Sequence, residues 1–125
     1  MIQSQKEPPV ILIVEDEFLI RAATAEIMRD AGFEVLEAAD ADRAMAMLET
    51  RSDVRVVFTD IHMPGSMDGA KLAQAVRHRW PPVRIIATSG RVSLEDLGLP
   101  AGTVLFPKPY SPEHVVWTLH ALTSS

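Results

Sequence analysis

The sequence predicts an α/β protein built on a doubly wound parallel sheet with helices on both faces. Short apolar runs rich in β-branched residues alternate with amphipathic segments along the chain. Strict alternation of this kind is typical of parallel strands joined by right-handed crossover helices. The chain has 125 residues, of which 47% are hydrophobic and 23% charged, which suits one domain with a substantial core. We therefore expect a single domain over residues 1–125, ordered from about residue 9 to residue 122.

The first half of the chain predicts three strands and two helices. The run VILIV, Val10–Val14, is expected to be a strand covered on both faces. Leu19, Ala23 and Ile27 recur at four-residue spacing, which predicts a helix over residues 17–31 with this apolar stripe, ended by Gly32. Phe33–Ala38 is expected to be a polar strand suited to a sheet edge. Asp40 is expected to cap a second helix, which carries Ala44 and Leu48 on its apolar stripe. Val54–Thr59 is expected to be a buried strand.

The second half continues the alternation. Leu72, Ala75 and Val76 predict a third helix, which ends at Trp80-Pro81-Pro82. Val83–Thr88 and Thr103–Phe106 are the fourth and fifth predicted strands. Between them, Ser93–Leu99 allows at most two helical turns. The last helix begins with Ser111 as its cap and Pro112 in its first turn. Its apolar stripe is Val115, Leu119 and Leu122.

The carboxyl ends of the predicted strands carry most of the chemistry. The first strand ends in Glu15-Asp16, the third in Asp60, the fourth in Thr88-Ser89-Gly90, and the fifth runs into Lys108. In a doubly wound sheet these ends meet at one edge, where ligands bind. Clustered carboxylates repel one another unless a cation intervenes, and hard oxygen ligands without a His or Cys pattern favour Mg²⁺.

Composition excludes several other classes of protein. The net charge of −5 argues against a nucleic-acid-binding surface. The absence of cysteine excludes disulfides and zinc–thiolate sites. No signal peptide and no apolar run of about 18 to 20 residues is present, so no membrane association is expected, and we predict a cytoplasmic location.

Four segments together resemble the receiver domain of bacterial two-component response regulators. They are VEDE, DIHMPGSMDG, TSG and KPY, and the resemblance runs from about Val10 to Leu122. It implies a flavodoxin-like sheet with strand order 2-1-3-4-5 and a short fourth helix. It also implies a phosphorylation-controlled switch, similar to single-domain chemotaxis regulators, that catalyses only its own phosphoryl uptake and loss. The expected partners are a histidine kinase or phosphotransfer protein and a downstream protein whose identity the sequence does not give; we also consider a weak homodimer.

The resemblance assigns a role to each residue at the strand ends. Asp60 is implied to be the phosphoacceptor, with Lys108 and the Ser89 hydroxyl contacting the phosphoryl oxygens. Mg²⁺ or Mn²⁺ is implied to be held by Glu15, Asp16, Asp60 and the backbone carbonyl of His62.

Alternatives remain open at two of these positions and for the function. Thr88 competes with Ser89 as the hydroxyl, and Glu15, one methylene longer than Asp, could bind the metal directly or through water. A Mg²⁺-dependent phosphohydrolase on a similar sheet is one rival; haloacid dehalogenases carry a second Asp two places after the nucleophile, where this chain has His62. An unphosphorylated interaction module is the other rival, and the intact Asp60 and Lys108 oppose it.

Three further expectations concern the last third of the chain. The resemblance suggests that Lys108-Pro109 is a cis peptide. Receivers usually place an aromatic residue three positions before the lysine, but here that position is Leu105, and Phe106 should point to the opposite side of the strand. We therefore predict that the response runs through the loop between Gly90 and Gly102 rather than through rotation of an aromatic side chain. Trp117 lies off the stripe of the last helix and either covers a neighbouring side chain or is an exposed anchor for a partner or a second copy.

Overall fold

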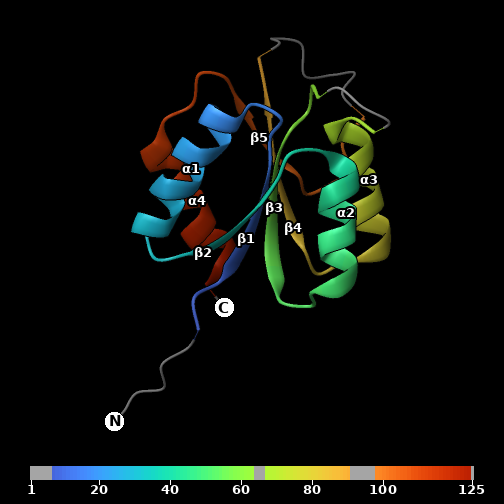
Figure 1. Cartoon of the computed structure of the whole chain (residues 1–125), viewed down its shortest axis with the longest axis horizontal. Coiled ribbons are helices and arrows are strands. Elements are labelled where there is room, and N and C mark those ends of the chain that lie inside the picture. Colours follow the sequence, from blue (N-terminus) through green and yellow to red (C-terminus); the bar gives the residue numbers. More distant parts are fainter. Residues whose placement is uncertain (1–6, 64–66, 91–97, 125) are drawn as a thin grey trace.

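A five-stranded parallel sheet forms the centre of the protein (Figure 1). The computed structural model describes residues 7–63, 67–90 and 98–124. The strands lie in the order β2-β1-β3-β4-β5, which confirms the predicted fold class and the polar strand at one edge. In chain order the elements are β1 (Val10–Val14), α1 (Phe18–Asp30), β2 (Glu34–Ala38), α2 (Ala41–Thr50), β3 (Val54–Asp60), α3 (Gly69–Arg79), β4 (Arg84–Ser89), β5 (Val104–Pro107) and α4 (Pro112–Thr123). The short helix expected over Ser93–Leu99 falls mostly on residues 91–97, which lie outside the described residues.

The sheet separates two hydrophobic cores because successive side chains of each strand point to opposite faces. Figure 1 shows α1 and α4 on one face and α2 and α3 on the other. The core beneath α2 and α3 includes Leu12, Val14, Ala44, Leu48, Val57, Leu72, Val76 and Ile85. The core beneath α1 and α4 includes Ile11, Ile13, Met28, Val56, Phe58, Ile86, Phe106, Val115 and Leu119.

Helices α2 and α4 begin at the caps that the sequence predicted. The Asp40 side chain accepts a hydrogen bond from the Arg43 amide at 2.8 Å, and Ser111 accepts one from the His114 amide at 3.4 Å. Each cap satisfies an amide that has no partner within its own helix. Within the described ranges, no helix is both long and apolar enough to cross a membrane.

The predicted buried stripe of α1 is wrong. Leu19, Ala23 and Ile27 lie on the exposed side of the helix, and Leu19 is 78% exposed. Ala25 and Met28 are fully buried instead. Apolar residues occur around most of this helix, so two different faces have helical spacing, and spacing alone did not identify the one that packs on the sheet.

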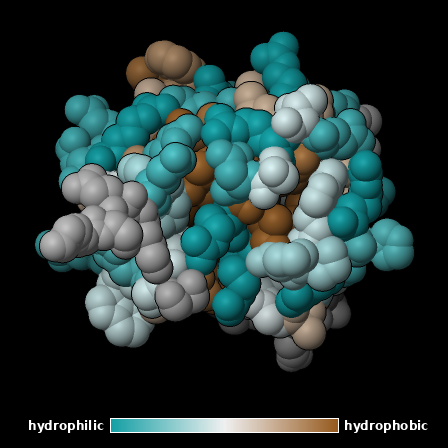
Figure 2. Space-filling view, turned by 90° about the horizontal axis from the view of Figure 1, so that it is seen from below, coloured by the Kyte–Doolittle hydropathy of each residue, from teal (hydrophilic) through white to brown (hydrophobic). Residues whose placement is uncertain are grey.

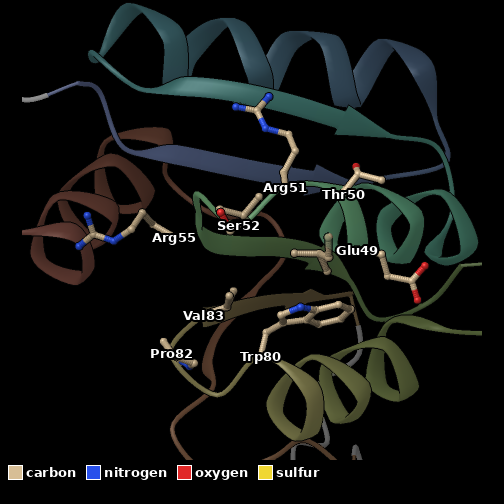
Figure 3. Close-up of a pocket in the computed structure, with 10 residues that line it drawn as sticks. Glu49, Thr50, Arg51, Ser52, Arg55, Trp80, Pro82 and Val83 are labelled. Carbon is tan, nitrogen blue, oxygen red and sulfur yellow. The ribbon is translucent and has the colours of Figure 1, made fainter.

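A hollow of about 430 Å³ lies at the amino-terminal ends of β3 and β4, at the edge of the sheet opposite Asp60 (Figure 3). Figure 2 shows the protein from this side, where apolar side chains lie between hydrophilic ones. Trp80 forms one wall of the hollow; Arg79 lies over its ring at 4.5 Å from the centroid and pairs with Glu49 at 3.0 Å. Trp80 also packs against the core beneath α2 and α3, so this end of the core is covered by an aromatic ring.

The packing of α1 leads to a stability prediction. Met28→Ala should lower the free energy of unfolding by about 2–5 kcal/mol, because it removes buried volume from a closed core. Leu19→Ala, the matched truncation on the exposed side, should change it by less than about 0.5 kcal/mol. Urea denaturation followed by circular dichroism measures both; a loss for Leu19→Ala as large as that for Met28→Ala would show that the Leu19 face of α1 is buried too.

Candidate functional site

Three carboxylates meet at the carboxyl-terminal edge of the sheet. One carboxylate oxygen each of Glu15, Asp16 and Asp60 lies within 4.8 Å of the other two. Glu15 and Asp16 follow the last residue of β1, and Asp60 is the last residue of β3, which pairs with β1. The sequence predicted this convergence from strand order, and the structure brings these residues together.

Asp60 is held by two donors. Its Oδ1 accepts a hydrogen bond from the His62 amide at 3.1 Å, and its Oδ2 accepts one from Lys108 Nζ at 2.8 Å. Asp60 is only 8% exposed, which limits the directions from which another molecule can reach it. The His62 side chain is exposed, so this residue contributes to the site through its backbone.

Lys108 is positioned by the β4–β5 edge. Its amide donates to the Ser89 carbonyl at 2.8 Å, just beyond the last paired residues of these strands. Burial acts to lower the pKa of Lys108, but the hydrogen bond and charge of Asp60 outweigh burial, and the pKa is raised. Lys108 is therefore a fixed cation at neutral pH. The Lys108-Pro109 bond is cis, which confirms the prediction.

Glu15 is buried beside Asp60. Burial raises the pKa of Glu15. The Glu17 amide donates a hydrogen bond to Glu15 Oε2 at 3.0 Å, which lowers this pKa in part, and the charge of Asp60 raises it further. The net effect is a raised pKa. A cation placed between these carboxylates would relieve their mutual repulsion.

The donor set fits a hard divalent cation. All three clustered side chains offer carboxylate oxygens, the ligands preferred by Mg²⁺, and one of them, Asp16, is exposed and therefore accessible from solvent. The same oxygens suit Mn²⁺. The hollow of Figure 3 contains none of these residues and lies at the opposite edge of the sheet, so it is separate from this site.

Both candidate hydroxyls are buried at the end of β4. Thr88 pairs directly with Asp60 in the β3–β4 ladder, and its carbonyl accepts the Ile61 amide at 2.9 Å. Ser89 is the last residue of the strand, one position further toward the edge, and its carbonyl accepts the Lys108 amide. The choice between the two hydroxyls stays a prediction.

Gly69 is a residue of this site that the sequence analysis missed. A Cβ on Gly69 would lie 1.9 Å from the Asp60 carbonyl oxygen and 2.7 Å from the Ile61 Cα. Its amide donates to the Ile61 carbonyl at 2.9 Å, and the Asp68 side chain caps the same helix by accepting from the Lys71 amide. Only glycine therefore lets α3 begin against the backbone that carries Asp60. The Asp-Gly pair at a helix start was the available signal.

Leu105 and Phe106 lie on opposite sides of β5, as predicted. Phe106 is buried in the core beneath α1 and α4, together with its neighbour of the same face, Val104. Its ring makes an edge contact with His114 at 5.1 Å. Leu105 is half-buried and belongs to neither core. Trp117 is 68% exposed, with its ring 6.3 Å from that of His114, and its role, either covering a neighbouring side chain or anchoring a partner or a second copy, stays a prediction.

Comparison with known proteins identifies the class. Residues 11–116 match the response regulator receiver domain family, and the chain belongs to this family. It is 35% identical over 113 residues to the hydrogenase transcriptional regulatory protein HoxA of Cupriavidus necator, a match that covers 87% of this chain and 23% of that protein. It is 33% identical over 110 residues to the nitrogen assimilation regulatory protein NtrX of Azorhizobium caulinodans, covering 85% and 24%. The chain spans about a quarter of the length of these curated relatives.

Solved structures give the same result. The fold matches the chemotaxis protein CheY4 of Vibrio cholerae with a TM-score of 0.80 and 28% identity, covering 92% of this chain and 98% of that one. It matches the receiver domain of the hybrid histidine kinase CckA with a TM-score of 0.77 and 29% identity, covering 92% and 99%. The chain is thus a receiver domain of the two-component response regulators, a family of signalling switches.

Proposed function

We propose that this receiver accepts its phosphoryl group on Asp60. The observation that carries this assignment is the Asp60 carboxylate, which ends a central strand, lies in an acidic cluster and is bound by Lys108 at 2.8 Å. A carboxylate is already ionised and needs no base to become a nucleophile. The proposed donor is the phosphohistidine of a histidine kinase or phosphotransfer protein.

The transfer is a single displacement at phosphorus. A carboxylate oxygen of Asp60 forms a bond to phosphorus, the bond from phosphorus to the donor imidazole nitrogen breaks, and the imidazole leaves with the electron pair and takes up a proton. Phosphoryl transfer depends mainly on positioning and on neutralising charge. Lys108, already at the Asp60 carboxylate, can contact a phosphoryl oxygen built on it, and the His62 amide can donate to another.

Glu15, Asp16 and Asp60 would hold Mg²⁺ or Mn²⁺, and the His62 carbonyl is a further proposed ligand. When bound, the ion supplies positive charge to the phosphoryl oxygens. The protein residues position the nucleophile: pairing of β3 with β4 fixes the backbone of Asp60, and Gly69 lets α3 approach the Asp60 carbonyl. We infer no catalytic turnover beyond uptake and loss of this one phosphoryl group, and a cytoplasmic location stays a prediction of the sequence.

The rival functions are less well supported. A phosphohydrolase similar to haloacid dehalogenases would need a second carboxylate two places after Asp60, and His62, whose ring is exposed, occupies that place. An interaction module without phosphorylation would not require Lys108 to bind Asp60 among clustered carboxylates.

Intact-mass measurement tests the phosphoacceptor. With a small phosphodonor and Mg²⁺, the unaltered chain should gain one phosphoryl group, and Asp60→Asn should gain none. Asp40→Asn is the matched control, because asparagine caps a helix as well as aspartate does and α2 is retained. Equal labelling of Asp60→Asn and the unaltered chain would place the phosphoryl group on another residue.

We propose that the Ser89 hydroxyl donates a hydrogen bond to an oxygen of the phosphoryl group. Ser89 lies one residue, about 3.3 Å, further toward the strand ends than Thr88, whereas Thr88 pairs directly with Asp60, so that its side chain shares the face of the carboxylate and Thr88 stays the alternative. Ser89 is also tied through its carbonyl to Lys108, the other proposed phosphoryl contact.

A pair of truncations separates the two hydroxyls. Ser89→Ala should slow phosphoryl uptake at Asp60 by about ten- to a hundred-fold, the amount expected for losing one hydrogen bond to a charged group. Thr88→Ala, which removes a buried hydroxyl from the neighbouring position, should slow it far less. The rate of mass gain with the small phosphodonor measures both, and the reverse ranking would give the role to Thr88.

The response to phosphorylation is inferred to bypass an aromatic rotation at position 105. Leu105 has no ring to rotate, and Phe106 is packed in the opposite core against His114. The loop expected to carry the response falls largely on residues 91–97, outside the described part of the chain. Its later part is bound to α3: Gln74 donates to the Gly98 carbonyl and Arg77 to the Ala101 carbonyl.

Nuclear magnetic resonance can test this inference. Phosphorylation should shift backbone signals between Arg91 and Ala101 strongly and the Phe106 ring signals little. Leu105→Ala should retain phosphorylation of Asp60 and, since Leu105 is only half-buried, cost less than the roughly 2–5 kcal/mol of a buried leucine. Large ring shifts at Phe106 with an unchanged loop would contradict the inference.

A further inference from the structure

Arg21 connects helix α1 to the end of strand β1. Its Nη1 donates to the carbonyl oxygen of Glu15 at 2.8 Å, and its Nε pairs with Glu37 Oε1 on β2 at 3.3 Å. The side chain is 15% exposed, and its guanidinium lies 5.5 Å from the Phe18 ring centroid, so the ring partly shields it. A planar guanidinium with several donors in fixed geometry suits this double contact, which a lysine could not reproduce.

We propose that Arg21 is a positioning residue for the metal site. It would act by fixing the backbone of the Glu15-Asp16 segment, without contact to the ion or to the phosphoryl group. The inference rests on the proposed Mg²⁺ site. Substituting a residue that holds metal ligands in place commonly lowers metal affinity by about ten- to a hundred-fold.

The segment needs such a restraint. Glu15 follows the last paired residue of β1, and its amide is bound by the Ala38 carbonyl at 3.1 Å. Its carbonyl is bound by Arg21, so both backbone polar groups of Glu15 are held. The carboxylates of Glu15, Asp16 and Asp60 repel one another, which favours opening of the β1–α1 connection. The charge-assisted bond from Arg21 opposes this opening.

Arg29 provides a matched comparison on the same helix. It pairs with the other oxygen of Glu37, Oε2, at 3.3 Å and donates to the Val35 carbonyl at 2.9 Å. It therefore makes the same two kinds of contact as Arg21, although it is more exposed, at 48%. Its carbonyl partner lies within β2, away from the acidic cluster, so losing Arg29 removes a tie between α1 and β2 without releasing Glu15.

The expected effect of losing Arg21 on Mg²⁺ affinity is opposite to the effect that its charge alone would have. By Coulomb's law, removing a cation near three carboxylates should tighten Mg²⁺ binding. If Arg21 positions the ligands, Arg21→Gln should weaken it instead, by about ten-fold or more. Arg21→Lys keeps the charge and loses the double contact, so it should also bind Mg²⁺ more weakly than the unaltered chain. Arg29→Gln should stay within about two-fold.

Isothermal titration of Mg²⁺ into the unphosphorylated full chain measures these affinities, and urea denaturation shows that each variant is folded. The proposal expects Arg21→Gln and Arg21→Lys to lose affinity while Arg29→Gln, with a comparable change in urea midpoint, does not. Unchanged or tighter binding by Arg21→Gln would overturn it, as would equal losses for the Arg21 and Arg29 variants. An unaltered chain that binds no Mg²⁺ would overturn the proposed metal site itself, an outcome distinct from these. Should Arg21→Gln not fold, Arg21→Lys decides.

Discussion

Repulsion among carboxylates at one edge of the sheet is the constraint around which this structure is organised. Glu15, Asp16 and Asp60 lie within 4.8 Å of one another, and such an arrangement persists only if neighbouring groups hold it. Lys108 supplies an ammonium bound to Asp60, and the Arg21 guanidinium donates a hydrogen bond to the backbone carbonyl of Glu15. A bound divalent cation would complete the balance of charge.

The rest of the fold places these groups with little freedom. Asp60 ends a strand that is paired on both sides, so its backbone is fixed by β1 and β4 together. Helix α3 begins against the Asp60 carbonyl, at a distance that only Gly69 allows. Lys108 is attached through its amide to the end of β4. Rigid strands therefore supply the position, and the loops that follow them supply access, which is the usual division of labour in parallel α/β sheets.

The Arg21 and Arg29 contacts agree with the face of α1 that packs on the sheet, which differs from the stripe that the sequence indicated. Both guanidinium groups pair with Glu37 on β2, on the side of the helix that packs on the sheet. Met28 faces the core, while Leu19 faces solvent. Apolar spacing was present on both sides of this helix, so the spacing alone did not indicate which side packs. The ion pairs join residues 16 and 8 positions apart in sequence, and they agree with the side that packs in the structure.

Local patterns in the sequence determined the elements, the parallel sheet and the convergence of Asp60, Glu15 and Lys108, because strand ends in such a sheet share one edge. They also placed the caps of α2 and α4, Asp40 and Ser111, which depend on neighbouring residues only. Tertiary structure alone decided the rotation of α1, the close approach at Gly69 and the double contact of Arg21. Each of these depends on distances between segments far apart in the chain, and spacing along one segment carries no record of such distances.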